Sequence, residues 1–594
     1  MLHNRITQDE ELERPFNMNQ LKRLLAYMRP YRKEMSITLT LMFVAAFCGL
    51  LGPRILQIAI DDYMVQQKYG ALAGLSAVFL AVNAISALCM HQRVRTMSEV
   101  GQKVLYRIRQ DMFNHIQKLS FNYFDSRPAG KILVRIINDV NSLGDLLTNG
   151  IVNVLTDIAT LILVIVMLAS MDYRLMLIAL SVLPLMLVAI LSLKKVIRHR
   201  WQAVRRKSSN MNAYLHETLS GMRVTQAYIR EPETNAIFKG LCQDLRSSWM
   251  NAIHVNNLMG PFSEVIATVA VVLVYWFGVG MIDSGTVTVG VLVAFSSYVW
   301  RFWQPVNNIC NFYNSILMAM ASTERIFELL DTPADIYDHG NAEEMPDIQG
   351  RVAFENLTFC YEPENPVLTD INFRVAPGET IALVGPTGAG KSTIVNLISR
   401  FYEPVKGRVL VDGVDINTVS MNSLRRQMGV MMQDSFIFSG TIMDNIRYGR
   451  LDASDEEVME AARVVHADGF IREMERGYQT EVHERGSRLS QGQRQLISFA
   501  RALLADPRIL ILDEATSSID TETEILVQKG LEQLLKGRTS FVIAHRLSTI
   551  RNADRIMVID DGKIKECGSH DELMKQKGEY YELYLSQYRF LEAV

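Results

Sequence analysis

The stretch Gly385-Pro-Thr-Gly-Ala-Gly-Lys391-Ser392 decides the fold of the second half of the chain. Two glycines separated by four residues, then lysine and a hydroxyl residue, form the phosphate-loop pattern. Small residues let the backbone curl until its N–H groups point at phosphate oxygens. A strand-like run, Thr380-Ile-Ala-Leu-Val384, precedes the loop and a helical run follows it, which is the context the pattern requires. We predict a nucleoside triphosphate site, with Lys391 on the β- and γ-phosphates and Ser392 on Mg²⁺.

Length and composition indicate several domains, and one part of the chain is predicted to lie in a membrane. The chain has 594 residues, and 49% of them are hydrophobic, which is high for a fully soluble protein. Six cysteines are scattered without a Cys-x-x-Cys pair, which argues against a disulfide framework and against a zinc site. The first sixteen residues carry several acids and no apolar core, so neither a cleaved secretory signal nor an organelle transit peptide is expected.

Six apolar segments in the first half are each near the ~20 residues that span a bilayer. A single such segment would also fit a buried helix of a soluble domain, but six of them predict an all-α membrane domain. The fifth and sixth contain polar residues such as Glu264 and Arg301, so their ends are less sharply defined. The predicted spans are 35–60, 70–90, 148–170, 175–193, 262–282 and 287–310.

Lysine and arginine gather in two loops, which orients the membrane domain. The connections after the second and fourth spans are rich in both residues, whereas the other loops offer little beyond Lys68 and Arg174. By the positive-inside rule both long connections are cytoplasmic, and with an even number of spans both termini are too. Helical periodicity continues through these connections. We therefore expect paired helices that extend into the cytoplasm and turn at Arg127-Pro-Ala-Gly130 and at Ser220-Gly221.

Two short segments beside the spans have apolar patterns of their own. Three aromatic residues in Leu119-Ser-Phe-Asn-Tyr-Phe-Asp125 stand just before the first turn, so this turn is predicted to contact a cytoplasmic domain rather than to be solvated. Near the N-terminus, Leu21, Leu24, Leu25 and Met28 recur at helical spacing among basic residues. That pattern is typical of an amphipathic helix on the inner membrane surface, or of a helix that packs on the protein.

The second half carries two further elements that fit the phosphate loop. Ile509-Leu-Ile-Leu512 has the pattern of a buried strand and ends in Asp513-Glu514, which suits a carboxylate for Mg²⁺ followed by a general base for the attacking water. Leu489-Ser-Gln-Gly-Gln493 opens another helix, and a helix start of this kind is a second anion site. One nucleotide seldom needs two distant helix N-termini and a lysine. The second site is therefore predicted to serve a nucleotide held by another chain, in a dimer.

Together these motifs resemble a known family. With LSQGQRQ about twenty residues before ILILDEATSSID, the second half is similar to the nucleotide-binding domain of ATP-binding cassette (ABC) transporters. The whole chain resembles a half-transporter of the exporter type, in which an all-α six-helix transmembrane domain is fused to an α/β P-loop ATPase. The expected parts are 1–34 (tail and amphipathic elbow helix), 35–320 (transmembrane domain with cytoplasmic extensions), 321–350 (linker) and 351–594 (nucleotide-binding domain).

The resemblance also implies roles for single residues. Catalysis is assigned to Glu514, His545 and Lys391, and Mg²⁺ is assigned to Ser392, Gln433 and Asp513. The implied ATP-binding residues are Tyr361 (stacked on adenine), Gly385, Pro386, Thr387, Gly388, Ala389, Gly390, Lys391, Ser392, Thr393 and Gln433. The signature offered to the partner's ATP is Ser490, Gln491, Gly492 and Gln493, and the loop that signals across the dimer includes Ser517 and Asp520. The segment Thr480–Gly486 resembles one that touches the cytoplasmic turns, with His483 where glycine is more usual; a solvated turn is the alternative.

Two positions bear on the identity of the partner chain. Glu514 is intact, whereas the signature has Gln491 where glycine is more usual. The Gln491 side chain either crowds the γ-phosphate or points away from it. The combination resembles the subunit of heterodimeric bacterial multidrug exporters that keeps the catalytic glutamate. A second half-transporter chain is therefore expected as the partner, with a heterodimer favoured over a homodimer.

The resemblance implies ATP-driven export of hydrophobic or amphipathic compounds (drugs, lipids or peptides) by alternating access across the inner membrane of a bacterium. Import of a metal chelate or similar small molecule is one alternative, and an ATP-gated channel or regulatory receptor is another. The membrane spans exclude a nucleic-acid partner. Aromatic residues of the sixth span either line a substrate cavity or face lipid and neighbouring helices. They are Phe295, Tyr298, Trp300, Phe302 and Trp303.

Overall fold

The computed structural model describes residues 18–334, 338, 342–362, 365–432, 435–483, 486, 488–513, 521–543 and 550–588. The chain divides into two compact units. The first comprises the described parts of Met1–Asn114 and Ile132–Asp331, and the second comprises His115–Lys131 and the described parts of Thr332–Val594. A short piece of the first half of the sequence, residues 115–131, therefore belongs to the same unit as the second half.

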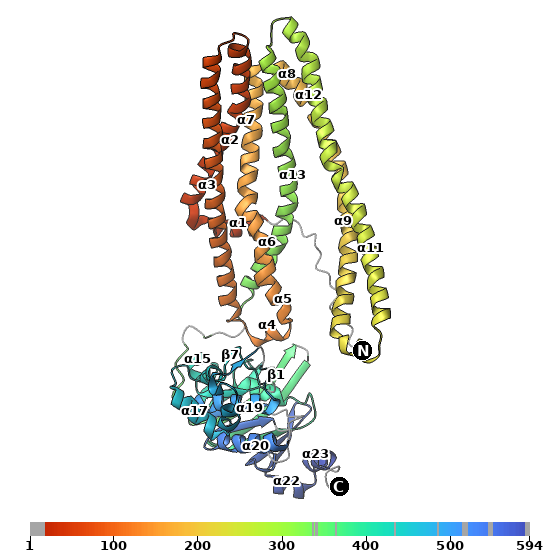
Figure 1. Cartoon of the computed structure of the whole chain (residues 1–594). Helices are drawn as coiled ribbons and strands as arrows, with labels where there is room; N and C mark the ends of the chain where they lie inside the picture. Colours follow the sequence, from red (N-terminus) through yellow and green to blue (C-terminus); the bar gives the residue numbers. More distant parts are fainter. Residues whose placement is uncertain are drawn as a thin grey trace. The chain divides into compact units, whose positions relative to one another are not determined.

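The first unit is all-α, as expected, and is built from long helices (Figure 1). Over the described residues, four stretches are long and apolar enough to cross a membrane: Arg29–Met64, Tyr69–Ile116, Ala129–Met171 and Glu231–Asp283. The helices are α1 (Met18–Ala26), α2 (Arg32–Ile58), α3 (Tyr69–Ile116), α5 (Ala129–Val134), α6 (Val140–Asp145), α7 (Ile151–Met171), α8 (Tyr173–Leu180), α9 (Leu183–Ser220), α10 (Met222–Ala227), α11 (Glu231–Asn257), α12 (Met259–Asp283) and α13 (Val289–Asp331). Short π-helical turns join some of them, namely η3 (Ala59–Met64), η4 (Arg135–Asp139) and η5 (Leu146–Gly150).

Two aspartate side chains accept hydrogen bonds at the starts of helices. The chain is extended at Asp172, where α7 ends, and the Asp172 carboxylate accepts hydrogen bonds from the backbone N–H groups of Arg174 (2.8 Å) and Leu175 (3.0 Å) at the start of α8. Asp61, in η3, accepts hydrogen bonds from Thr288 Oγ1 (2.6 Å) and from the Gly290 backbone N–H (2.9 Å). The end of the first predicted span is thereby joined to the start of α13.

The pairing of helices predicted after the fourth span is confirmed. Figure 1 shows α9 and α11 side by side, with α10 (Met222–Ala227) between them in the chain. Lys207 Nζ on α9 lies 2.6 Å from an Asp244 carboxylate oxygen on α11, and the ring centroids of Trp201 and Trp249 are 5.0 Å apart. The helix α9 ends at Ser220 and is followed by Gly221, which is the predicted turn.

The N-terminal helix α1 packs on the end of α13. Leu24 is fully buried, and the Arg23 guanidinium makes two hydrogen bonds, of 2.6 and 2.7 Å, to the Asp331 carboxylate. The central carbon (Cζ) of the Arg23 guanidinium lies 4.2 Å from the Phe327 ring centroid, within cation–π range. Leu25, on another side of α1, stays 36% exposed. The structure therefore confirms packing on the protein through one face of this amphipathic helix and leaves another face uncovered.

The second unit is an α/β fold with the short helix α4 (Phe121–Asp125) from the first half of the chain. Its strands are β1 (Val352–Glu362), β2 (Asn365–Val375), β3 (Thr380–Val384), β4 (Lys406–Val411), β5 (Val414–Asp415), β6 (Met428–Met431), β7 (Gly440–Thr441), β8 (Glu481–Val482), β9 (Ile509–Asp513), β10 (Thr539–Ile543), β11 (Arg555–Asp560) and β12 (Lys563–Gly568). Its other helices are α14 (Lys391–Ile398), α15 (Met421–Arg425), α16 (Ile442–Arg447), α17 (Asp455–Val464), α18 (Asp468–Glu473), α19 (Gln491–Leu504), α20 (Thr521–Leu535), α22 (His570–Gln576) and α23 (Glu579–Tyr588).

A six-stranded sheet, in the order β12-β11-β3-β10-β9-β6, forms the centre of this unit. All its neighbouring strands are parallel except β12, which runs antiparallel to β11. Along β3, Ile381 and Leu383 pack into one hydrophobic core while Ala382 and Val384 pack into another, because successive side chains of a strand point to opposite faces. Ile543 pairs in register with Leu383, so β3 and β10 end at the same edge, where ligands of such sheets bind.

Candidate functional site

The predicted phosphate loop lies between β3 and α14. Gly385 has a φ of +147°, and a Cβ atom there would lie 2.0 Å from the carbonyl oxygen of Ile559 on β11, so only glycine fits. Gly388 has a φ of +88°, with open space around it. Both glycines hold the backbone in a region that other residues rarely adopt. The close approach to β11 fixes the start of the loop against the sheet.

Lys391, the first residue of α14, turns its ammonium group back over the loop. Its Nζ donates hydrogen bonds to the carbonyl oxygens of Gly385 and Pro386, at 2.8 Å each. Burial lowers the pKa of Lys391, and the charge of Asp513 opposes that shift. A cation held beside glycine-rich backbone and the start of a helix suits a phosphate group.

Tyr361, near the end of β1, is placed beside α14. Its hydroxyl oxygen lies 3.2 Å from Thr393 Oγ1, and its ring contacts Phe359 and Tyr402 edge-on, with centroids 4.8 and 5.0 Å apart. The residue remains 42% exposed. Neighbouring rings therefore fix the orientation of Tyr361 while part of its surface stays available to stack on a planar base.

Asp513 ends β9 at the same edge of the sheet as the phosphate loop, since Ile543 of β10 pairs with both Leu383 and Asp513. The Asp513 carboxylate and the Ser392 hydroxyl are oxygen ligands of the kind that Mg²⁺ prefers, so this donor set fits the ion. Five predicted site residues lie outside the described part of the chain: Gln433, Glu514, Ser517, Asp520 and His545. In the sequence, Gln433, Glu514 and His545 come just after the ends of β6, β9 and β10.

The signature residues form the start of α19. The Ser490 side chain accepts a hydrogen bond from the Gln493 backbone N–H (3.2 Å), and the Gln493 side chain accepts one from the Ser490 backbone N–H (2.9 Å). This reciprocal capping box fixes the first turn of the helix, in which Gln491 is partly exposed and Gly492 is buried. In the neighbouring segment His483 is exposed, whereas Glu484 and Arg485 fall outside the described residues.

The first cytoplasmic turn contacts the ATPase part of the chain, as predicted. The Tyr402 hydroxyl, in a residue only 8% exposed, donates a short hydrogen bond to the Asp125 carboxylate of α4. Beside it, the rings of Phe121 and Phe401 have centroids 4.4 Å apart. Burial, then the Asp125 carboxylate, raise the pKa of Tyr402. Sequence reasoning did not single out Tyr402. The sequence feature that could have indicated it is the aromatic pair Phe401-Tyr402, which begins three residues after the end of α14.

Four of the five aromatic residues of the sixth span are buried and do not line a cavity here, whereas Trp300 is 46% exposed. Phe295 and Tyr298 are fully buried, Phe302 and Trp303 are 7% and 5% exposed, and all four belong to one core of the membrane domain. The expectation of a cavity is wrong for these four, and the alternative that they contact neighbouring helices is confirmed. Tyr298 donates a 2.6 Å hydrogen bond to the Leu50 carbonyl oxygen, which ties α13 to α2.

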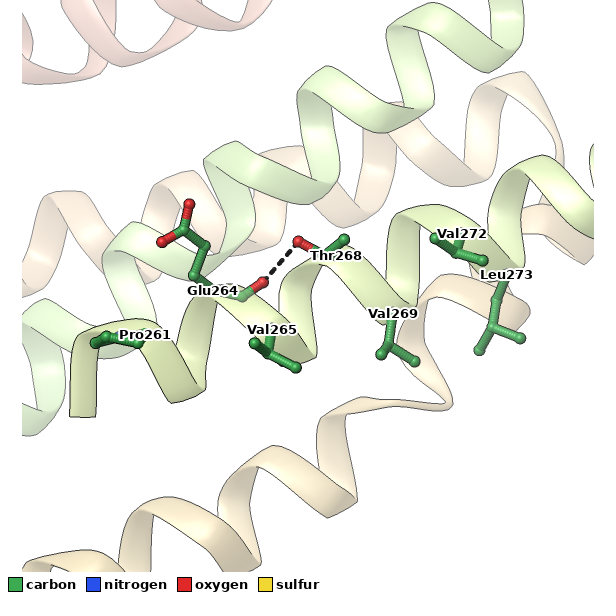
Figure 2. Close-up of a pocket in the computed structure, with 7 residues that line it drawn as sticks. All are labelled: Pro261, Glu264, Val265, Thr268, Val269, Val272 and Leu273. Atoms are coloured by element: carbon green, nitrogen blue, oxygen red, sulfur yellow. Dashed lines mark hydrogen bonds between the residues drawn. The ribbon is translucent and has the colours of Figure 1, made fainter. Parts of the chain in front are cut away.

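A cavity of about 470 Å³ lies instead along α12. Figure 2 shows Glu264, Thr268 and Val272 following one another along the helix, beside a second stripe that includes Val265 and Val269. Thr268 Oγ1 donates a 2.8 Å hydrogen bond to the backbone carbonyl oxygen of Glu264, so the Glu264 carboxylate is not used by this contact. The lining residues are Pro261, Glu264, Val265, Thr268, Val269, Val272 and Leu273.

Comparisons with known proteins agree with this architecture. The family model of the ABC transporter transmembrane region matches residues 35–306, and the ABC transporter model matches residues 368–517. The chain is 46% identical over 592 residues to YknV of Bacillus subtilis (strain 168), an uncharacterized ABC transporter ATP-binding protein, covering 98% of this chain and 96% of that protein. It is 36% identical over 589 residues to the ATP-dependent lipid A-core flippase of Syntrophus aciditrophicus (strain SB), covering 99% and 98%. A solved structure of a bacterial Atm1-family ABC exporter with ATP bound has a TM-score of 0.79 and 29% identity, covering 94% of this chain and 98% of that one.

A helical membrane domain fused to a parallel-sheet ATPase with a phosphate loop defines the class of ATP-driven membrane transporters. The chain belongs to the ABC transporter family, as an exporter half-transporter. It binds and hydrolyses ATP to drive export, and it crosses the inner membrane several times with its ATPase domain in the cytoplasm. Half-transporters of this family generally function as dimers.

Proposed function

We propose that this chain exports a hydrophobic or amphipathic compound as one half of a dimer in which each ATP is closed between two chains. The observation that carries the proposal is that one chain presents two separate anion-binding elements. One is the phosphate loop with Lys391, and the other is the Ser490-capped start of α19. The phosphate loop of one chain then faces the signature of the other.

Each site residue has a role in this arrangement. The phosphate loop and Lys391 bind the phosphates, and Tyr361 stacks on adenine. Glu514 polarises the attacking water, and His545 contacts the γ-phosphate. Ser392, Gln433 and Asp513 hold Mg²⁺, which when bound neutralises charge on the β- and γ-phosphates. Ser517 and Asp520 transmit the state of one site to the other.

ATP drives export because it binds the closed dimer better than the open one, which shifts the population between two packings of the helices. The cytoplasmic turns, including α4, carry this closure to the membrane domain. Hydrolysis then resets the open state. In this cycle the parts of the chain are the tail and elbow helix (1–34), the transmembrane domain (35–320), the linker (321–350) and the nucleotide-binding domain (351–594).

Two features support finer statements about partner and substrate. Gln491, in the first turn of α19, adds a side chain where the partner's γ-phosphate approaches, so a heterodimer with a partner carrying a regular signature is favoured. The similarity to a lipid A-core flippase supports a lipid-like or otherwise amphipathic compound as substrate.

The test uses the full chain in inside-out membrane vesicles, alone and co-expressed with a second half-transporter. Glu514→Gln should lower ATP hydrolysis by at least about 100-fold and stop ATP-dependent uptake, because general-base catalysis contributes 10²–10⁴-fold. Glu475→Gln, the same charge change at an exposed position of the ATPase domain, serves as the control. Hydrolysis that survives Glu514→Gln would refute the assignment of the base. Full activity of the chain expressed alone would refute the heterodimer.

A further inference from the structure

Two buried ionic groups lie within the membrane domain, on neighbouring helices. Arg93 of α3 and Asp157 of α7 are each 9% exposed, and Asp157 lies inside the predicted third span. Ionisable residues at membrane depth are costly, so they usually pair with one another or take part in function. Both side chains are covered by this chain alone, so their burial does not depend on the partner chain of the dimer.

The contacts along α3 follow an antiparallel register. Arg109 of α3 donates a 2.6 Å hydrogen bond to the side chain of Asn141 on α6. One turn back along α3, Leu105 Cδ1 lies 3.4 Å from the place that a Cβ atom on Gly144 would take. Each turn back along α3 is therefore matched by three or four residues forward along the helices that pack against it.

The same register brings Arg93 opposite Asp157. One further turn back, a Cβ atom on Gly101 would lie 2.2 Å from Thr148 Cγ2, so α3 and η5 are in close contact there. Two more turns back along α3 reach Arg93, and nine residues forward from Thr148 reach Asp157 on α7. The two side chains are near enough for their charges to interact.

Neither group has a full set of partners in this packing. Asn308 of α13 donates a 3.3 Å hydrogen bond to Asp157 Oδ1, whereas Asp157 Oδ2 has no hydrogen-bond partner within the described residues. The Arg93 guanidinium makes no hydrogen bond or ion pair to the part of the chain that the structure describes. Because an unpaired buried charge is strongly destabilising, a displacement that joins the two groups stabilises the packing that permits it.

We propose that Arg93 and Asp157 form a conformational switch in the membrane domain. Asp157 is bonded to Asn308 in the packing described here, and it pairs directly with Arg93 in the second packing of the export cycle. The close contact at Gly101 acts as the pivot, and a displacement of α3 against α7 beyond this pivot brings the two groups together. The inference rests on the proposed function, since it assigns a charge pair to one of the two packings that ATP is proposed to interconvert. A contact made in one packing only biases the equilibrium between them.

Disulfide trapping measures the change in geometry directly. The six native cysteines are replaced by alanine in the full chain, which is purified as a dimer in lipid nanodiscs. Arg93→Cys with Asp157→Cys should form a disulfide at rates that differ at least tenfold between the nucleotide-free protein and the protein saturated with a non-hydrolysable ATP analogue. Leu105→Cys with Gly144→Cys, on the other side of the pivot, is the matched control and should cross-link at the same rate in both states.

The affinity for the analogue measures the energetic contribution of the pair. Asp157→Asn keeps the shape of the side chain and removes its charge. It should change the affinity at least fivefold, because a contact made in one packing is linked to the ligand that selects between packings. Arg93→Gln should act in the same direction, and the double variant should shift the affinity no further than one single change, since all three remove the same pair. Asp62→Asn, the same change at an exposed position of η3, should have no effect.

Three results would overturn the inference. The first is an equal cross-linking rate of the Arg93 and Asp157 positions in the two nucleotide states, which a water-bridged pair of fixed geometry would give. The second is an equally large change in the control pair, which would show a general loosening of the helices. The third is an additive effect of Arg93→Gln and Asp157→Asn on the affinity for the analogue.

Closure of the dimer is followed separately, so that failure of the switch and failure of the proposed function can be told apart. Spin labels are placed at Tyr228→Cys, beside the second cytoplasmic turn, and at Leu451→Cys on the ATPase domain, where both side chains are exposed. If the analogue changes the distance between the labels but not the cross-linking rate, only the switch is refuted. If the distance does not change either, the two packings of the proposed function are refuted as well.

Discussion

The hydrogen bond between Tyr402 and Asp125 allows a direct measurement of how firmly the first cytoplasmic turn is held. Tyr402→Phe removes the hydroxyl and keeps the ring, which continues to pack beside Tyr361. A hydrogen bond to a charged group contributes about 1.5–3 kcal/mol. Asp125 is exposed and can bind water once released, so the lower end applies, about 1.5 kcal/mol. That value corresponds to a roughly tenfold change in the docking equilibrium.

Hydrogen exchange is the appropriate assay, since it reports local opening. The backbone N–H groups of Tyr123 and Ser126 are hydrogen-bonded within the turn, to the carbonyl oxygens of Ser120 and Asn122. Their exchange should be about tenfold faster in Tyr402→Phe. Coupling should weaken in parallel, so that transported compounds stimulate hydrolysis less. Combining Tyr402→Phe with Asp125→Ala should add little, because both changes remove the same bond.

Tyr478 supplies a matched control. It is also 8% exposed, and its hydroxyl donates a 2.8 Å hydrogen bond to Asp468 elsewhere in the ATPase domain. Tyr478→Phe should destabilise the domain to a similar extent and leave exchange in the turn unchanged. The reasoning is refuted if Tyr402→Phe leaves that exchange unaltered, or if Tyr478→Phe accelerates it equally.

Three further outcomes are expected. Gly385→Ala should weaken ATP binding, measured by equilibrium dialysis, at least tenfold more than Gly388→Ala, because only the first adds a backbone clash to the ~1–2 kcal/mol of left-handed strain. Ser490→Ala should remove a helix cap worth ~1 kcal/mol and slow hydrolysis, whereas Ser490→Thr should preserve it; equal hydrolysis in both variants would contradict the role of the cap. Hydrogen bonds from Thr441 hold the pKa of Asp444 below its usual value. The ionised Asp444 carboxylate therefore stabilises the folded domain at neutral pH, and this stabilisation is lost as the pH falls through the lowered pKa of Asp444 in the folded state. The melting temperature of Asp444→Asn should therefore drop less on acidification than that of the wild type.

Much of the fold followed from local sequence patterns. Long apolar runs and the distribution of Lys and Arg predicted a helical membrane domain, because span length and orientation depend on composition over ~20 residues. The phosphate loop and the capped start of α19 were also predictable, since Gly385 and Ser490 act on backbone only a few residues away. The roles proposed for Glu514 and His545 remain predictions that come from the sequence.

Other features depended on contacts between distant parts of the chain. The sequence left open whether the aromatic residues of the sixth span line a cavity or face lipid and neighbouring helices. Packing against other helices decided the matter for Phe295 and Tyr298, which are fully buried. Periodicity shows that a helix has an apolar face, but it does not show which neighbour covers that face.

The sequence alone determined that the chain has a membrane part, a phosphate loop and a second anion-binding helix start, because each depends on residues close together in the chain. Only the tertiary structure paired Tyr402 with Asp125, which are 277 residues apart, and joined Asn308 of α13 to Asp157 of α7. Hydrogen bonds of this kind arise when the sheet and the helices pack, and no local pattern encodes the partner that each side chain meets.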